Sequence, residues 1–311
     1  MRGRASTWRS AWPNSSATSP ESTGVALSTA AALGLTAAWP VGNVAAAVLQ
    51  NGRTIASVGD VDHRFKVASL TKPVAAWAML VAVEEGSIDL DTPLGQPGCT
   101  LRHLMSHAGG YPFQGHDAIA VPARTRTYSN GGIEIAAEGI AAATGLTFDT
   151  YLSEAVLQPL GMHASTLVGT PAHGLTSSVT DFAAFVTEVV SPTLISASTR
   201  DQATQVHYPS LGGIVPGVGR YERCPWGLGF EIRGDKSPHW TGAHNSESTF
   251  GHFGGAGTMF WIDPAADLAL IAFTDRRFDL WADEALRAWP QLSDAVLAEF
   301  ADGTPVEPAA P

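Results

Sequence analysis

A serine and a lysine stand three residues apart at the start of a long apolar segment. Ser69 and Lys72 are followed by Pro73 and by an apolar run over residues 74–83. Proline is tolerated in the first turn of a helix, where its missing N–H would be unpaired anyway, so the pattern predicts a helix that begins near Ser69. The two side chains would share one face of this helix. Because the run has no polar face, we expect the helix to be buried on nearly all sides.

This arrangement offers an activated nucleophile. A serine hydroxyl attacks a carbonyl carbon efficiently only when a base removes its proton. Burial penalises the charged form of a lysine and lowers its pKa, so Lys72 could be that base. The N-terminus of the helix favours negative charge that develops at Ser69. The chain has three lysines, Lys66, Lys72 and Lys236, so one of them at the mouth of a buried helix calls for a reason.

Two further motifs carry polar side chains beside glycines. Tyr128-Ser129-Asn130-Gly131-Gly132 precedes a helical run over residues 133–143, so Tyr128 should lie on a loop at the entrance of a helix. A purely structural interpretation makes Asn130 the cap of that helix. The second motif, His252-Phe253-Gly254-Gly255, falls on a predicted strand. Its structural interpretation is a strand edge with a bulge caused by glycine.

Predicted strands lie near both ends of the chain. Residues 41–50 are apolar, and the Asn51-Gly52 dipeptide that follows accepts the positive φ angles of a tight hairpin turn, so residues 53–59 would return antiparallel. A terminal helix is expected over residues 280–300, where apolar residues recur at helical spacing. Further strands are predicted at residues 226–232, 249–252, 257–262 and 268–274.

The middle of the chain, from Lys72 to about residue 190, has helical periodicity instead. We therefore predict an α+β fold, with an antiparallel sheet built from both chain ends, flanked by terminal helices, and an inserted mostly helical region. The first of those helices is expected at residues 25–39. One domain should span residues 23–300, with an α/β part at 23–66 and 225–300 and a helical part at 67–224. Disordered tails are expected at 1–22 and 301–311.

Composition excludes several classes of function. The net charge of -11 argues against a nucleic-acid partner, which would need clustered Lys and Arg. No apolar run reaches the ~20 residues that cross a bilayer. The basic residues near the N-terminus are interrupted by Pro13, Pro20 and Glu21, so a cytoplasmic location is favoured over a secretory signal, with export left open. Cys99 and Cys224 form no C-x-x-C pair, and whether they form a disulfide is left open.

The three motifs in this order resemble the serine β-lactamase and penicillin-binding-protein superfamily. The Tyr-x-Asn and His-x-Gly forms are similar to the class C β-lactamase branch, which includes D-alanyl-D-alanine peptidases, D-aminopeptidases and esterases. The resemblance extends over residues 41–274. Other segments that resemble the branch are residues 67–73 at the nucleophile, 101–110, the Gln-Pro-Leu-Gly-Met segment at 158–162 and the strand at 226–230.

The resemblance implies an acyl-enzyme mechanism. Ser69 would attack a carbonyl carbon, while Lys72 and a Tyr128 made more acidic by that lysine handle the protons. Which of these two groups takes the first proton is left open, because coupled groups share their titration. The resemblance also implies substrate-binding roles for Asn130, His252, Gly254 and Gly255, with the N–H groups of Ser69 and Gly255 as the oxyanion hole. No metal and no cofactor is implied.

The substrate class stays open between β-lactams, D-amino-acid peptides and simple esters. The chain has His252-Phe253-Gly254 where the family often has Lys-Thr-Gly, and its spacing from Tyr128 to His252 is short compared with that of large class C β-lactamases. These departures favour an esterase or a D-alanyl-D-alanine carboxypeptidase over a true β-lactamase. The partner would be a small molecule or a short peptide with a carbonyl centre; the oligomeric state is not predicted.

Two other classes of protein compete with this interpretation. A metal hydrolase is suggested by His103 and His107, which are four residues apart, but neither belongs to an H-E-x-x-H motif. A non-catalytic protein that recognises penicillin or serves as a scaffold is the second alternative. The complete set of Ser69, Lys72 and Tyr128 argues against it.

Overall fold

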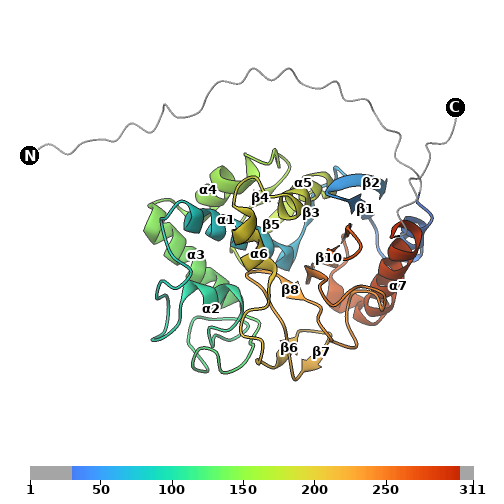
Figure 1. The fold of residues 1–311 in the computed structure, drawn as a ribbon. Helices are drawn as coiled ribbons and strands as arrows, with labels where there is room; N and C mark the ends of the chain where they lie inside the picture. Colours follow the sequence, from blue (N-terminus) through green and yellow to red (C-terminus); the bar gives the residue numbers. More distant parts are fainter. Residues whose placement is uncertain (1–29, 302–311) are drawn as a thin grey trace, which may run out of the picture.

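A six-stranded antiparallel sheet forms the centre of the molecule, in a computed structural model that describes residues 30–301 (Figure 1). Its strand order is β2-β1-β11-β10-β9-β8. Two strands come from the N-terminal part of the chain and four from the C-terminal part, as the sequence predicted. The strands are β1 (Val44–Gln50), β2 (Arg53–Val58), β8 (Glu231–Ile232), β9 (Phe250–Gly254), β10 (Thr258–Asp263) and β11 (Leu268–Thr274).

The predicted hairpin between β1 and β2 is present. Asn51 and Gly52 have φ angles of 49° and 73°, which the turn requires and which these two residues tolerate. β1 also pairs with β11, and Val44 lies opposite Thr274 in that ladder. This pairing joins the two ends of the chain in one sheet.

Each face of the sheet is covered by helices, because the strands are apolar on both sides. Ala45, Ala47 and Leu49 of β1 belong to one hydrophobic cluster, while the alternating Ala46 and Val48 belong to the other. The 3-10 helix η1 (Ala32–Ala38) and α7 (Ala282–Phe300) pack against each other, and α7 also contacts β11. α5 (Val179–Val190) contacts β1 and β11 and contributes Phe182 and Phe185 to the first cluster.

The inserted region is mostly helical, as predicted. It also contains the short sheet β3-β5-β4, whose strand β5 contacts the 3-10 helix η2 that precedes α1, and the hairpin β6–β7. Its helices are η2 (Ala68–Leu70), α1 (Thr71–Glu84), α2 (Leu101–Met105), α3 (Asn130–Thr144), α4 (Phe148–Leu152), the π-helical turn η3 (Ser153–Leu157), α5 and α6 (Ala197–Thr204). Its strands are β3 (Phe65–Lys66), β4 (Thr166–Leu167), β5 (Leu175–Ser177), β6 (Gly213–Val215) and β7 (Gly219–Tyr221).

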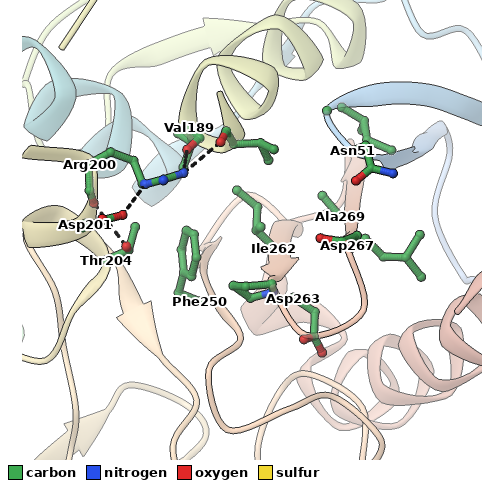
Figure 2. Close-up of a pocket in the computed structure, with 15 residues that line it drawn as sticks. Asn51, Val189, Arg200, Asp201, Thr204, Phe250, Ile262, Asp263, Asp267 and Ala269 are labelled. Atoms are coloured by element: carbon green, nitrogen blue, oxygen red, sulfur yellow. Dashed lines mark hydrogen bonds and ion pairs between the residues drawn. The ribbon is translucent and has the colours of Figure 1, made fainter. Parts of the chain in front are cut away.

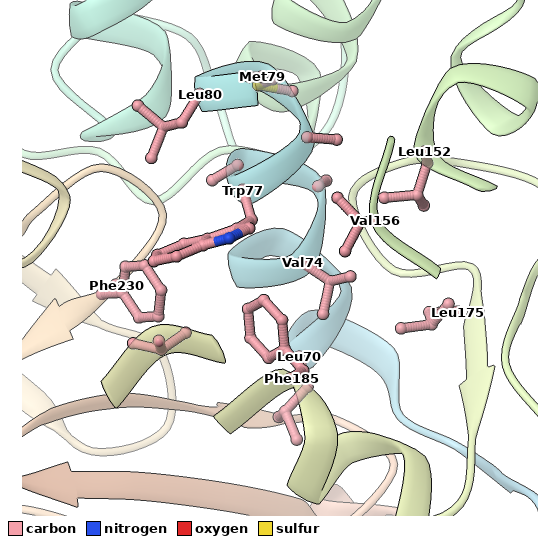
Figure 3. Packing of buried hydrophobic residues seen from close by; sticks show 14 of the residues in the cluster. Leu70, Val74, Trp77, Met79, Leu80, Leu152, Val156, Leu175, Phe185 and Phe230 are labelled. Carbon is pink, nitrogen blue, oxygen red and sulfur yellow. The ribbon is translucent and has the colours of Figure 1, made fainter. Parts of the chain in front are cut away.

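The helix α1 passes through the middle of the larger hydrophobic cluster (Figure 3). All residues from Thr71 to Ala82 are buried, which confirms the prediction drawn from the missing polar face. Trp77 packs edge-on against Phe185 and Phe230, and its indole N–H donates to the buried Glu188 at 3.2 Å. A helix held on every side gives the groups at its N-terminus a fixed position.

Some boundaries differ from those expected. The strand predicted over residues 226–232 is limited to β8, because Gly229 adopts a φ of 86° and the N–H of Gly227 donates to the carbonyl of Phe230 in a turn. Within the described residues, the predicted first helix at 25–39 is the 3-10 helix η1. The tails predicted at 1–22 and 301–311 lie outside the described residues, apart from Ala301. The division of the domain at residues 66 and 224 stays a prediction.

Candidate active site

Ser69 lies in the short 3-10 helix η2 that leads into α1. The residue before it, Ala68, has a φ of 47°, a left-handed conformation that costs an alanine about 1–2 kcal/mol. The surrounding backbone holds this segment from two sides. The N–H of Val67 donates to the carbonyl of Leu175 in β5 at 3.0 Å, and the hydroxyl of Thr258 in β10 donates to the carbonyl of Val67 at 2.9 Å.

The Lys72 side chain is fully buried and makes three hydrogen bonds. Its Nζ lies 3.3 Å from the Oγ of Ser69, 2.6 Å from the Oδ1 of Asn130 and 2.9 Å from the carbonyl oxygen of Ala172. These partners come from η2, α3 and the loop before β5. The three acceptors use the whole donor capacity of an ammonium group.

The pKa of Lys72 is lowered to about 7 because burial disfavours its charged form, and the nearby Glu134 carboxylate opposes part of that shift. Near neutral pH a large share of the lysine is therefore uncharged. An uncharged amine has a lone pair and can accept the proton of Ser69.

Ser129, and not Asn130, caps the helix α3. The Oγ of Ser129 accepts the N–H of Gly132 at 2.9 Å and donates to the carbonyl of Pro112 at 2.6 Å. The purely structural interpretation of Asn130 as the cap does not hold, because Asn130 is already the first helical residue. Its side chain is left to contact Lys72.

Tyr128 lies directly before this cap and closes the other side of the site. The Lys72 Nζ is 4.7 Å from the centroid of the phenol ring. Burial raises the pKa of Tyr128, and the nearby Ser69 side chain opposes this rise only in part. The expectation that Lys72 makes Tyr128 more acidic is therefore wrong. Because its own pKa is about 7, Lys72 is uncharged at the high pH where a phenol loses its proton, so it exerts no Coulombic pull on that proton.

Two buried histidines and a tryptophan surround the Tyr128 ring. The ring centroids of His107, His252 and Trp226 lie 4.6, 5.7 and 5.9 Å from that of Tyr128. The Nδ1 of His107 accepts the N–H of Ser129 at 3.2 Å, whereas the Nδ1 of His252 donates to the carbonyl of Phe253 at 2.6 Å. These bonds assign opposite tautomers, so the Nε2 of His107 bears a proton and that of His252 has a lone pair.

Both histidines are neutral at physiological pH. Burial, followed by the charge of Lys72, lowers the pKa of His252 to about 4, and the same causes hold the pKa of His107 well below its usual value. Neither Nε2 atom has a hydrogen-bond partner among residues 30–301. The Nε2 of His252 is thus a buried acceptor without a partner among the described residues.

The two glycines of the third motif differ in their surroundings. A Cβ on Gly254 would lie 2.4 Å from the carbonyl oxygen of Val67 and 3.3 Å from the Cβ of Ala68, so only glycine lets β9 approach the nucleophile segment. A Cβ on Gly255 would have no neighbour within 4 Å. Gly255 is exposed at the end of β9, where its backbone can face an incoming substrate.

All seven predicted residues lie at the N-terminal end of α1, although they are spread from position 69 to position 255. Sequence reasoning missed the carbonyl of Ala172, which no side-chain pattern could reveal, and Trp226. It also left out His107, although the resemblance at residues 101–110 contained it.

Other features of the described residues do not offer an alternative site. A cavity of about 330 Å³ lies at the opposite end of the strands, against Asn51, Phe250 and Ile262 (Figure 2). Its arginine, Arg200, already bonds Asp201 and the carbonyl of Val190. Residues 30–301 contain no group of three or more His, Cys, Asp and Glu that could hold a metal. Cys99 and Cys224 are buried free thiols. No helix in the same range is long and apolar enough to span a membrane.

The fold and the sequence match known proteins. A β-lactamase from Mycobacterium bovis is 47% identical, with a TM-score of 0.85, and the match covers 87% of this chain and 99% of that one. The octameric penicillin-binding protein homologue from Pyrococcus abyssi is 18% identical (TM-score 0.68), with 88% and 77% covered. Simvastatin synthase from Aspergillus terreus is 16% identical (TM-score 0.70), with 85% and 95% covered. At 18% and 16% identity, the proteins from P. abyssi and A. terreus show a similarity of fold alone.

A search of curated proteins gave no match. The model of the family described as Beta-lactamase matches residues 38–292, a range that contains the whole cluster around Ser69. The chain therefore belongs to the Beta-lactamase family, whose members include serine hydrolases.

Proposed function

We propose that this chain is a serine hydrolase that forms an acyl-enzyme at Ser69. The observation that supports the proposal most directly is the buried Lys72 amine, 3.3 Å from the Ser69 hydroxyl and with its pKa lowered to about 7. A lysine in this state is a base at the pH where its partner must lose a proton.

In the proposed acylation, the Ser69 Oγ forms a bond to the substrate carbonyl carbon and its proton passes to the Lys72 Nζ. The carbonyl becomes an oxyanion, for which the N–H groups of Ser69 and Gly255 are the proposed donors. One such donor contributes roughly 10²–10³ in rate. The tetrahedral intermediate then collapses, and the bond to the leaving group breaks.

The proposed path of the proton to the leaving group is through Tyr128. The phenol ring lies against Lys72, and Ser69 is close enough to lower the pKa of the phenol, so Tyr128 can donate its own proton to the departing oxygen or nitrogen while it takes one from Lys72. A raised pKa keeps Tyr128 protonated until this step. In deacylation, the same groups would remove a proton from water and return it to Ser69.

Asn130 and His252 have supporting roles in this scheme. The side-chain oxygen of Asn130 fixes the Lys72 amine at 2.6 Å. The free lone pair of His252 could accept a hydrogen bond from a substrate N–H or O–H, but an uncharged imidazole is a weak partner for a carboxylate. This argues against substrates whose carboxylate would be held at His252.

Simple carboxylic esters are the substrate class that we favour. The second candidate is β-lactam hydrolysis, because the protein from M. bovis that is 47% identical is a β-lactamase. A D-alanyl-D-alanine carboxypeptidase would act by the same steps on a peptide. A non-catalytic penicillin-recognising protein would acylate without turnover or bind without acylation.

Initial rates with p-nitrophenyl butyrate, nitrocefin and a D-alanyl-D-alanine peptide test the assignment, with Ser69→Ala as the control for each substrate. We expect the ester to give the highest kcat/KM and the alanine variant to abolish all three activities. Nitrocefin turnover above that of the ester would replace the esterase assignment with a β-lactamase. Binding of all three compounds without turnover would favour the non-catalytic alternative.

A further inference from the structure

A cavity of about 520 Å³ adjoins Tyr128. It lies between the loop before α3 and the hairpin β6–β7. Of the residues in the catalytic cluster, Tyr128 lines this cavity. The lining residues are Phe113, Thr125, Arg126, Thr127, Tyr128, Gly213, Ile214, Pro216 and Arg220.

The hairpin is firmly attached to the Tyr128 segment. Arg126 forms a parallel bridge with Gly213, and its N–H donates to the carbonyl of Gly212 at 2.9 Å. A Cβ on Gly213 would lie 2.6 Å from the Cβ of Arg126, so glycine allows this close approach. These contacts fix the hairpin wall of the cavity against the Tyr128 segment.

One wall of the cavity is apolar and unusually exposed. Phe113 is 51% exposed, and its ring stacks on that of Tyr128 with 5.9 Å between centroids. Its carbonyl accepts the N–H of Asn130 at 3.0 Å, which fixes it beside the catalytic cluster. Ile214 on the opposite wall is 43% exposed. Two exposed apolar side chains that face one hollow are suited to an apolar or aromatic group of a ligand.

The hairpin wall that holds Ile214 also carries a cation. Arg220 lies directly across from Ile214 in the β6–β7 ladder, so both side chains are on the same face of the hairpin. Arg220 is exposed, and no hydrogen bond or ion pair to it is found within residues 30–301. Arg126 differs, because its guanidinium is buried and donates to the carbonyls of Cys224, Ser106 and His207.

The charge of the cavity contrasts with that of the chain. The net charge is -11, yet no carboxylate lines this hollow, and Arg220 is free to bind an anion. A positive potential in a concave, partly apolar site concentrates anionic ligands there. The guanidinium also matches a carboxylate in geometry.

We infer that this cavity binds the leaving group of the substrate, and that the preferred leaving group is an aryl or similar apolar alcohol or amine that carries a carboxylate. The inference rests on the proposed function, in which Tyr128 gives its proton to the leaving group and must therefore contact it. Phe113 and Ile214 would enclose the apolar part, and Arg220 would bind the carboxylate.

Two acetate esters with the same acyl group test this assignment. Phenyl acetate and 4-acetoxybenzoate differ only in the carboxylate on the leaving group. For the wild-type protein and Arg220→Gln, the ratio of kcat/KM for the anionic ester to that for the neutral one is compared. The control is Arg223→Gln, which removes the same charge from an exposed arginine that is paired with Asp235.

We expect Arg220→Gln to lower the ratio about fivefold or more, mainly through KM, and Arg223→Gln to leave it unchanged. Phe113→Ala should weaken both aryl esters relative to ethyl acetate, whereas Ile119→Ala, at an apolar residue of the same loop that is 65% exposed, should not. An unchanged ratio in Arg220→Gln, or equal losses in both arginine variants, would overturn the inference.

A binding measurement separates failure of the inference from failure of the proposed function. Calorimetric titration of Ser69→Ala with 4-hydroxybenzoate, the released alcohol, needs no turnover. Binding that Arg220→Gln weakens would support the anion site even if no ester were hydrolysed. Hydrolysis without any binding of 4-hydroxybenzoate and without preference for the anionic ester would keep the serine hydrolase and reject the leaving-group site.

Discussion

The Nζ of Lys72 lies 2.6 Å from the Oδ1 of Asn130, and this contact joins the first turn of α1 to the first turn of α3. The two residues are 58 positions apart in the sequence. Because the Lys72 amine is also held by the carbonyl of Ala172, it cannot turn away from Ser69 without losing a buried hydrogen bond. The amide thus fixes the direction of the proposed base.

Asn130→Ala should lower kcat for ester hydrolysis by about 10² while the fold is retained, because the amine loses one of its acceptors and its alignment with Ser69. Asn130→Asp is the informative companion. It keeps an oxygen acceptor but adds a negative charge that favours the lysine ammonium, so the midpoint of the pH profile should move upward. Two variants with equal rates and equal midpoints would contradict the role given to Asn130.

The pH dependence of kcat/KM follows from the lowered pKa of Lys72. The amine must be uncharged to accept the Ser69 proton, so activity should rise with pH through about 7 and level off above it. His252, whose pKa is lowered to about 4, should add no transition between pH 5 and pH 9. Initial rates from pH 5 to 9 with an uncharged ester measure this. A rate that falls across the same range would exclude Lys72 as the base.

The neighbouring glycines offer a matched pair of substitutions. Gly254→Ala should lower the melting temperature and remove most of the activity. The added Cβ would displace the carbonyl of Val67 and with it the Ser69 segment. Gly255→Ala should leave the melting temperature unchanged, since its Cβ meets no atom within 4 Å. A loss of kcat/KM in this second variant would then report contact with substrate. Equal thermal stability of both variants would contradict the packing argument.

The sequence predicts the fold well where local patterns decide it. The apolar run after Pro73, the Asn51-Gly52 turn and the strands near both ends are found where they were expected. The prediction was wrong where tertiary context decides. Residues 226–230 are apolar like a strand, yet Gly229 turns the backbone there.

The site residues could be named from motif order, but their states could not. Burial is a property of the whole fold, so the lowered pKa of Lys72 and the raised pKa of Tyr128 follow only from the packed structure. The motif pattern suggested an acidic tyrosine, and the structure reverses that. The carbonyl of Ala172 and the opposite tautomers of His107 and His252 likewise depend on contacts between distant segments.

Intact-protein mass spectrometry after acid quenching tests the central claim most directly. The wild-type protein, mixed with p-nitrophenyl butyrate and quenched at short times, should gain the mass of one butyryl group, and peptide mapping should place it on Ser69. Ser69→Ala should show neither the adduct nor turnover. An adduct on another residue, or ester hydrolysis that persists in Ser69→Ala, would contradict the account.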